Sequence, residues 1–220
     1  MADSQLFCVA EERSGHCAVV DGNFLYVWGG YVVRGRGGTG RTRAGKQIFW
    51  GWHNDVHVFD TKTQTWFQPE IKGGVPPQPR AAHTCAVLGN KGYIFGGRVL
   101  QTRMNDLHYL NLDTWTWSGR IPINGESPKH RSWHTLTPIA DDKLFLFGGL
   151  SADNIPLSDG WIHNYFTLFI IFNYRLWHTA CLGKENEIMV FGGSKDDLLS
   201  LDTGHCNDLL IFQTQPYSLL

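Results

Sequence analysis

Residues 80–97 read RAAHTCAVLGNKGYIFGG, and this stretch decides the fold of the chain. An Arg and a His stand three residues apart at its start, and a Gly-Gly pair ends it. Two apolar runs, 84–88 and 93–95, flank the polar turn 89–92. Two β-rich runs around a turn containing glycine and asparagine predict a β-hairpin.

The same pattern occurs four times along the chain. The first Gly of each pair follows the His by 13, 13, 14 and 14 residues. A pattern that recurs at nearly constant spacing indicates a repeat architecture. The four copies are Arg13/His16 with Gly29-Gly30, Arg80/His83 with Gly96-Gly97, Arg131/His134 with Gly148-Gly149, and Arg175/His178 with Gly192-Gly193.

Two further strands are expected after each hairpin. An Asn-Asp pair opens an apolar run at 54–60, 105–110 and 207–212, and residues 158–161 hold the same place in the third copy. Turns after Asp60 and Asp113 then lead into the aromatic residues Trp66 and Trp117. Each repeat is therefore predicted to contain four antiparallel strands, which is the composition of one β-propeller blade.

The composition agrees with an all-β chain of short strands and tight turns. Of the 220 residues, 13% are aromatic and 25 are glycine. The formal charge of -1 argues against nucleic acid or a membrane surface as a general partner. The longest apolar run, 165–174, is about half of what a bilayer span requires.

The cysteines show neither a C-x-x-C pair nor a regular spacing. The sequence therefore predicts neither a disulfide framework nor a zinc site. The N-terminus also lacks a basic region followed by a long apolar stretch, so no secretory signal is expected. A reduced, cytosolic location fits best. The cysteines are Cys8, Cys17, Cys85, Cys181 and Cys206.

Two segments depart from the repeat. Residues 32–46 are a surplus between Gly30 and Asn54, and they are basic and rich in glycine. This composition predicts a disordered insert, a flexible loop being favoured over an RNA- or phosphate-binding arm. The third repeat is nine residues shorter than its neighbours after Asp159. In their place stands the apolar run 165–174, which lacks charge and alternation and fits a fully buried strand.

The repeat resembles the kelch repeat, whose signature is a Gly-Gly pair after the second strand and an aromatic residue in the fourth. The resemblance covers nearly the whole chain, so residues 1–220 are expected to form one kelch propeller domain. Because kelch propellers commonly have six blades, the four recognisable blades are expected to form an incomplete version of such a ring. An unclosed arc would expose two apolar blade faces and should be less stable than a complete relative.

The stretches 98–114 and 131–134 resemble the small kelch-domain group that reads protein C-termini. In that group the propeller is the substrate receptor of a cullin-RING ubiquitin ligase and binds C-terminal degrons that end in glycine. Guanidinium groups suit a terminal carboxylate because they offer several fixed donors. Aromatic walls that leave no room for a Cβ select a terminal glycine. The resemblance implies a pocket at the propeller top formed by Arg98, Arg103, Ser132, Trp133, Trp52, Tyr31 and Trp177.

Full-length members of that group carry, after the propeller, helices that dock elongin B/C and a cullin. Here only residues 213–220 follow the last predicted strand, which is short for an amphipathic docking helix. This form is therefore expected to make no stable adaptor complex.

Catalysis is not expected, and neither is a cofactor. The sequence contains no G-x-S-x-G elbow, P-loop or paired-carboxylate motif. Copper oxidase chemistry, which some kelch-like propellers carry, would need a convergent Tyr/His/Cys set that the sequence does not display. The four motif histidines occupy equivalent places in different blades, so they cannot meet on one metal ion and are expected to be structural. A generic kelch scaffold for protein-protein interaction is the alternative to the degron receptor.

Overall fold

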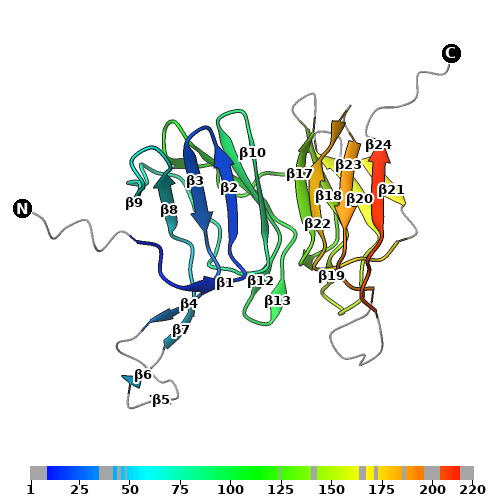
Figure 1. Ribbon diagram of the computed structural model, residues 1–220, viewed down its shortest axis with the longest axis horizontal. Coiled ribbons are helices and arrows are strands. Elements are labelled where there is room, and N and C mark those ends of the chain that lie inside the picture. The colour runs from blue at the N-terminus through cyan, green and yellow to red at the C-terminus, as the bar shows by residue number, and fades with distance from the viewer. Residues whose placement is uncertain are drawn as a thin grey trace, which may run out of the picture.

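The computed structural model describes residues 9–34, 42–43, 46–47, 49–123, 125–139, 143–163, 167–170, 173–184, 187–195 and 204–213. Strands dominate this part of the chain, and they form a row of twisted antiparallel sheets that stand face to face (Figure 1). Three of these sheets have four strands and one has three. We call them blades 1 to 4 in chain order. The all-β fold and the repeat units predicted from the sequence are confirmed.

Blades 1 and 2 each contain the four predicted strands, hydrogen-bonded in chain order. The predicted hairpin of blade 1 is present, with Cys17 opposite Trp28 and Asp21 opposite Phe24. Gly22 in its turn has a φ of 56°, a conformation in which glycine is unstrained. Blade 1 consists of β2 (Cys17–Asp21), β3 (Phe24–Trp28), β8 (Val56–Asp60) and β9 (Thr65–Phe67); blade 2 of β10 (Thr84–Leu88), β11 (Lys91–Phe95), β14 (Leu107–Asn111) and β15 (Thr116–Trp117).

Blades 3 and 4 differ in strand number. In blade 3 the apolar run 165–174 supplies a fourth strand, β21, in which Phe169 lies opposite Gly160. The prediction that this run is buried stays a prediction, because the side chains of residues 163–172 lie outside the described structure. Blade 4 has three strands among the described residues, and a fourth strand of this blade lies outside what they test. Blade 3 consists of β17 (Thr135–Ile139), β18 (Lys143–Phe147), β20 (Asp159–His163) and β21 (Thr167–Ile170); blade 4 of β22 (Thr179–Leu182), β23 (Glu187–Phe191) and β24 (Leu209–Gln213).

Small sheets gather at one end of the blades, the lower end in Figure 1. The segment 32–46, predicted to be disordered, contributes to them at residues 32–34 of β4 and in a short hairpin of β5 and β6. The rest of that segment lies outside the described residues. The small sheets comprise β1 (Arg13–Ser14) with β4 (Tyr31–Arg34) and β7 (Phe49–Trp52); β5 (Thr42–Arg43) with β6 (Lys46–Gln47); β12 (Arg98–Val99) with β13 (Thr102–Arg103); and β16 (Arg131–Ser132) with β19 (Leu150–Ser151).

The repeat arginines hold each blade together. The Arg80 guanidinium donates to both carboxylate oxygens of Asp106, at 2.6 and 2.8 Å, and to the Gly96 carbonyl at 2.8 Å. Burial alone would raise the pKa of Asp106, but hydrogen bonds from Arg80 and His108 hold it well below its usual value. Arg131 with Asp159 and Arg175 with Asp208 repeat the pairing. The Arg of the motif, the first Gly of the pair and the Asp at the start of the third strand thus form one polar unit, in which the arginine is fully buried and the aspartate becomes more exposed from blade 2 to blade 4.

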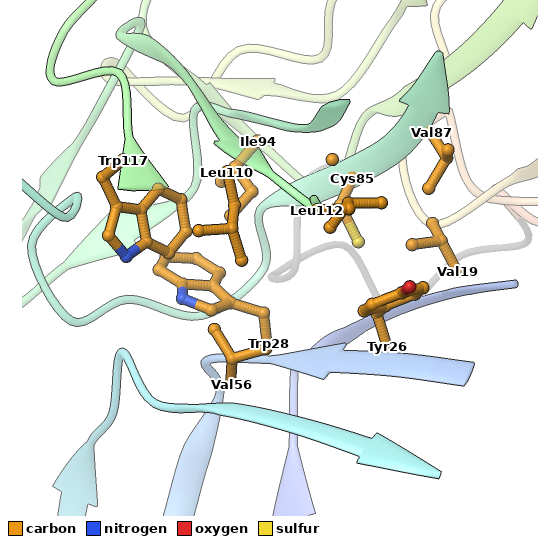
Figure 2. A pocket seen from close by; sticks show the side chains of 11 residues that line it. Val19, Tyr26, Trp28, Val56, Cys85, Val87, Ile94, Leu110, Leu112 and Trp117 are labelled. Atoms are coloured by element: carbon orange, nitrogen blue, oxygen red, sulfur yellow. The ribbon is translucent and has the colours of Figure 1, made fainter. Parts of the chain in front are cut away.

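Apolar side chains fill the three junctions between neighbouring blades. Figure 2 shows the junction of blades 1 and 2, where Trp28 and Val56 of blade 1 face Ile94, Leu110 and Trp117 of blade 2. Corresponding clusters join blades 2 and 3 and blades 3 and 4. The core of this protein therefore lies between its sheets, as a row of propeller blades requires.

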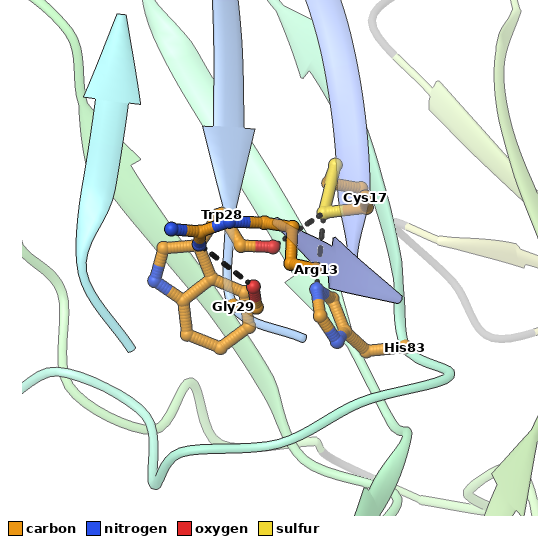
Figure 3. Close-up of a disulfide and its surroundings, with 6 residues drawn as sticks. Arg13, Cys17, Trp28, Gly29 and His83 are labelled. Carbon is orange, nitrogen blue, oxygen red and sulfur yellow. Dashed lines mark hydrogen bonds between the residues drawn. A yellow bond between two sulfur atoms is a disulfide. The ribbon is translucent and has the colours of Figure 1, made fainter. Parts of the chain in front are cut away.

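Cys17 of β2 and Cys85 of β10 form a disulfide (Figure 3). The prediction of a chain without disulfides is wrong for this pair. The two residues are 68 positions apart, and they meet because β2 and β10 are the neighbouring inner strands of blades 1 and 2. Spacing along the sequence shows no such pairing until the order of the blades is known.

Candidate functional site

An open pocket lies among the small sheets at the end of the blades. Its wall includes four of the seven residues expected from the family resemblance: Tyr31, Trp52, Arg98 and Trp133. They come from β4, β7, β12 and the residue after β16, so three different repeats contribute. The remaining lining residues are Ser14, Gly15, Ala81, Ala82, Leu100 and Gln101.

The hairpin of β12 and β13 positions two arginines side by side. Arg98 lies directly opposite Arg103 in its register. Arg98 is half-buried and donates to the Leu100 carbonyl at 2.8 Å and to the Gln101 side-chain oxygen at 3.1 Å. Both of these acceptors are neutral, so the charge of Arg98 is available to an anion.

Arg103 is buried, with 7% of its surface exposed. Its Nε donates to the Ser132 hydroxyl at 2.8 Å, and its guanidinium lies 5.6 Å from the centre of the Trp133 ring. Burial first, and then the charge of Arg98, lower the pKa of Arg103. Among the described residues, neither Arg98 nor Arg103 has an acidic side chain within salt-bridge distance. The two cations are thus held together without a counter-ion.

Aromatic rings stand around the arginines. Trp133 packs edge-on against Trp177, with ring centres 5.3 Å apart, and Trp177 keeps 42% of its surface exposed. Across the pocket, Tyr31 and Trp52 face each other in the β4–β7 register, also with ring centres 5.3 Å apart. The structure therefore gathers all seven expected residues at one place, four in the pocket wall and three in contact with them or with each other.

Sequence reasoning missed part of the wall. Gln101 fixes the Arg98 guanidinium, and Leu100, 67% exposed, stands at the rim. Gly15 and Ala82, which precede the motif histidines of the first two repeats, are further wall residues that were not predicted. A signal for them was present, because they hold the same place in the repeat as the predicted Trp133 and Trp177, and all four residues have positive φ.

Three of the four motif histidines, His83, His134 and His178, occupy the blade junctions rather than the pocket. His83 contacts the Trp28 ring edge-on, with ring centres 4.5 Å apart, and its Nε2 lies 3.1 Å from the Cys17 sulfur (Figure 3). Burial, and next the Arg80 guanidinium, lower the pKa of His83 to about 3. The same causes, with Arg131 as the neighbour, hold the pKa of His134 well below its usual value.

The part of the chain that the structure describes contains no group of three His, Cys, Asp or Glu side chains arranged to hold a metal ion. The same described part contains no helix with the length and apolar character needed to cross a membrane.

Sheets joined face to face, each closed by a Gly-Gly pair and an Arg–Asp unit, define the kelch type of β-propeller. The model of the KLHDC2/KLHL20/DRC7 Kelch-repeats domain matches residues 8–168, and this chain belongs to that family. Kelch-repeat domains generally serve as non-catalytic interaction modules.

The chain is similar to kelch domain-containing protein 1. It is 58% identical to the Homo sapiens protein and 55% to the Mus musculus protein, in each case over 344 residues that cover 100% of this chain and 85% of the relative. It is also 59% identical to kelch domain-containing protein 2 of Bos taurus over 113 residues, which cover 51% of this chain and 27% of that protein.

Proposed function

We propose that this chain binds the C-termini of other proteins in the pocket of Arg98 and Arg103, with preference for a terminal glycine. The single observation that carries the proposal is Arg103: a buried guanidinium with a neutral hydroxyl partner and an aromatic ring instead of a carboxylate. A buried cation without a counter-ion is costly, so such an arrangement suits a site that an anion completes.

The chemistry of the walls favours a peptide terminus over a free inorganic anion. A terminal carboxylate can take donors from both arginines, because planar guanidinium groups pair with carboxylates through two parallel hydrogen bonds. The indole and phenol rings of Trp52, Trp133 and Tyr31 offer apolar surface for the peptide backbone behind that carboxylate. A glycine at the last position fits a site walled by rings, because it adds no Cβ.

We extend the proposal to the family role: the bound C-terminus is a degron, and the propeller is the substrate-recognition part of a cullin-RING ubiquitin ligase. The resemblance of residues 98–114 and 131–134 to the group that reads C-termini supports this extension. Co-purification with elongin B/C and a cullin examines ligase coupling separately from peptide binding, and a stable complex would contradict the expectation that this form makes none. A cytosolic location also stays a prediction.

The binding experiment compares three versions of one peptide by titration calorimetry. The first ends in Gly-Gly with a free carboxylate, the second is amidated, and the third ends in Gly-Ala. Since a hydrogen bond to a charged group contributes about 1.5–3 kcal/mol, amidation should weaken binding at least about tenfold. Equal binding of the acid and the amide would refute the proposal, and would favour a general kelch scaffold that recognises its partner elsewhere.

A matched pair of variants locates the binding. Arg98→Ala should weaken binding of the free acid, whereas Arg120→Ala, an exposed arginine outside the pocket wall, should leave it unchanged. If both variants weaken binding equally, the effect reflects overall charge and not the pocket.

A further inference from the structure

The three junctions between blades share one pattern of contacts. The last aromatic residue before each Gly-Gly pair packs edge-on against the motif histidine of the next blade. Both partners are buried: the aromatic residues are 4%, 2% and 0% exposed and the histidines 4%, 3% and 6%. The ring centres lie 4.5 Å apart for Trp28 and His83, 5.5 Å for Phe95 and His134, and 5.1 Å for Phe147 and His178.

Backbone hydrogen bonds repeat with the same regularity. The second Gly of each pair donates its N–H to the carbonyl of the next motif arginine; these bonds are Gly30 to Arg80, Gly97 to Arg131 and Gly149 to Arg175, at 2.8, 2.8 and 2.7 Å. The residue before each motif histidine donates to its counterpart one blade back, as Ala82 does to Gly15 at 2.8 Å. A junction therefore has two unlike halves: the Gly-Gly end of one blade and the Arg-x-x-His start of the next.

Each end of the row of blades carries one half of a junction that has no partner blade in the described structure. At blade 4, Phe191 stands before Gly192-Gly193 and is 54% exposed, whereas its three counterparts are buried. At blade 1, His16 is exposed, whereas the other motif histidines are buried. Among the described residues, the row thus presents an aromatic residue without a histidine partner at one end and a histidine without an aromatic partner at the other.

The outer face of blade 4 is apolar around Phe191. In the strand register Phe191 lies opposite Leu209 and Met189 opposite Ile211, so all four share one face. Leu209 and Ile211 are 52% and 51% exposed. The alternate residues of β23, Ile188 and Val190, are fully buried against blade 3. Blade 4 therefore has one sealed face and one open face of similar apolar character.

The outer face of blade 1 matches this description. Val20 is 64% exposed and lies opposite Leu25, which in turn lies opposite Phe59 of β8. Phe59 packs against Trp66 with ring centres 5.1 Å apart. Facing the other way, Val19 and Tyr26 of the same strands line the sealed junction with blade 2 (Figure 2).

We propose that a second copy of this chain docks on these ends, with blade 4 of one copy packed face to face on blade 1 of the next. Phe191 then meets His16 of the second copy as Trp28 meets His83. The occupant is a second copy because one chain holds both halves of a junction whose halves already fit together three times within it. The interface is heterologous, so copies join head to tail and the assembly extends beyond two unless its ends meet.

The alignment to the relatives is longer than this chain. The alignment to kelch domain-containing protein 1 runs over 344 positions and covers the whole of this chain, which has 220 residues. In the remaining 124 positions, residues of the relative face no residue of this chain. One repeat, measured from Arg80 to Arg131, is 51 residues, so these positions exceed the length of two repeats.

Sedimentation velocity of the purified chain over a range of concentrations tests the proposal. The wild-type chain should sediment as dimers and longer assemblies as its concentration rises. Phe191→Arg and Val20→Arg, which place a charge on one or the other end face, should each sediment as monomers. Val75→Arg, at a 68% exposed position between β9 and β10, is the matched control and should assemble like the wild type. Circular dichroism checks that every variant is folded.

Mixing the two end variants gives the decisive result. Phe191→Arg keeps an intact blade 1 face and Val20→Arg an intact blade 4 face, so together they can form one junction and no more. The mixture should contain a dimer that neither variant forms alone. A wild-type chain that stays monomeric at every concentration would overturn the proposal, and so would folded variants that do not pair on mixing. Loss of assembly on Phe191→Arg alone, with Val20→Arg unaffected, would instead indicate a symmetric contact of blade 4 with itself and would also overturn it.

Discussion

Arg80 and Arg103 are both buried arginines, but the protein surrounds them differently. Arg80 is fully buried and paired through two hydrogen bonds with Asp106, and it also donates to the Gly96 carbonyl. Arg103 is 7% exposed and has a hydroxyl and an indole ring as its partners. The first arginine has its counter-ion within its own blade, whereas the second would receive one from a ligand.

This difference separates the repeat from the pocket in energetic terms. Replacing either partner of a buried pair such as Arg80–Asp106 lowers the stability of the protein strongly, because the remaining charge is buried without compensation. An unpaired buried arginine lowers the stability of the free protein, and a bound anion offsets that cost. The repeat units should therefore govern folding, and the pocket should govern binding.

Acid should disrupt the repeat most strongly. Three buried junction histidines have a pKa lowered in the fold, to about 3 for His83, to about 4 for His178, and well below its usual value for His134. The unfolded chain binds protons near pH 6.5 that the folded chain does not, so stability is full above that pH and falls as the pH drops below it. At pH 5 the loss should be about 2 kcal/mol for each of His83 and His178, and His134 should add a loss in the same direction.

Urea unfolding at pH 7.5, 6.0 and 5.0 measures this loss. The pairing of Asp106 with Arg80 holds the pKa of its carboxyl below the usual 3.8, so that carboxyl does not contribute in this range. A midpoint that is constant between pH 7.5 and 5.0 would contradict neutral, buried junction histidines.

The next largest effect is expected from Arg80→Met. The substitution keeps much of the side-chain volume but leaves Asp106 buried without its partner, which should cost about 3–5 kcal/mol. Thermal melting followed by circular dichroism measures the change, with the exposed Arg120→Met as control. A melting temperature equal to that of the control would show that the repeat arginine is dispensable.

A smaller loss is expected when the Cys17–Cys85 disulfide is removed. It closes a separation of 68 residues between blades 1 and 2, and bonds of this kind typically stabilise by about 2–4 kcal/mol. Cys85→Ser should lower the urea midpoint under non-reducing conditions, whereas Cys181→Ser, which replaces a free exposed cysteine, should not. Equal midpoints for the two variants would mean that the bond does not support the junction.

The sequence predicted the blades well because their signals are local. The turn of residues 21–23 sits between two apolar runs, and β2 and β3 follow those runs residue by residue. The Cys17–Cys85 bond escaped prediction because it depends on which blades become neighbours, a property of the whole fold.

The residues of the candidate site are predicted by the family resemblance more than by the chemistry of the sequence itself. Arg98 and Arg103 were visible as two charges close together in a loop, a pattern that also suits a solvated surface. Only the structure reveals that Arg103 is buried against Ser132 and Trp133, 29 and 30 residues further on. Gln101 and Leu100 were missed because an exposed loop residue carries no signal of its own until the pocket is assembled.

Arg103→Met, the substitution already proposed at Arg80, tests the central claim most directly. The stability and the affinity for a peptide ending in Gly-Gly are measured on the same preparation. Stability should change by less than about 1 kcal/mol, since an unpaired buried charge is removed together with its one hydrogen bond, while binding should weaken at least about tenfold. A variant that melts several kcal/mol earlier, or that binds the peptide as tightly as the wild type, would contradict the assignment of Arg103 to the pocket and not to the fold.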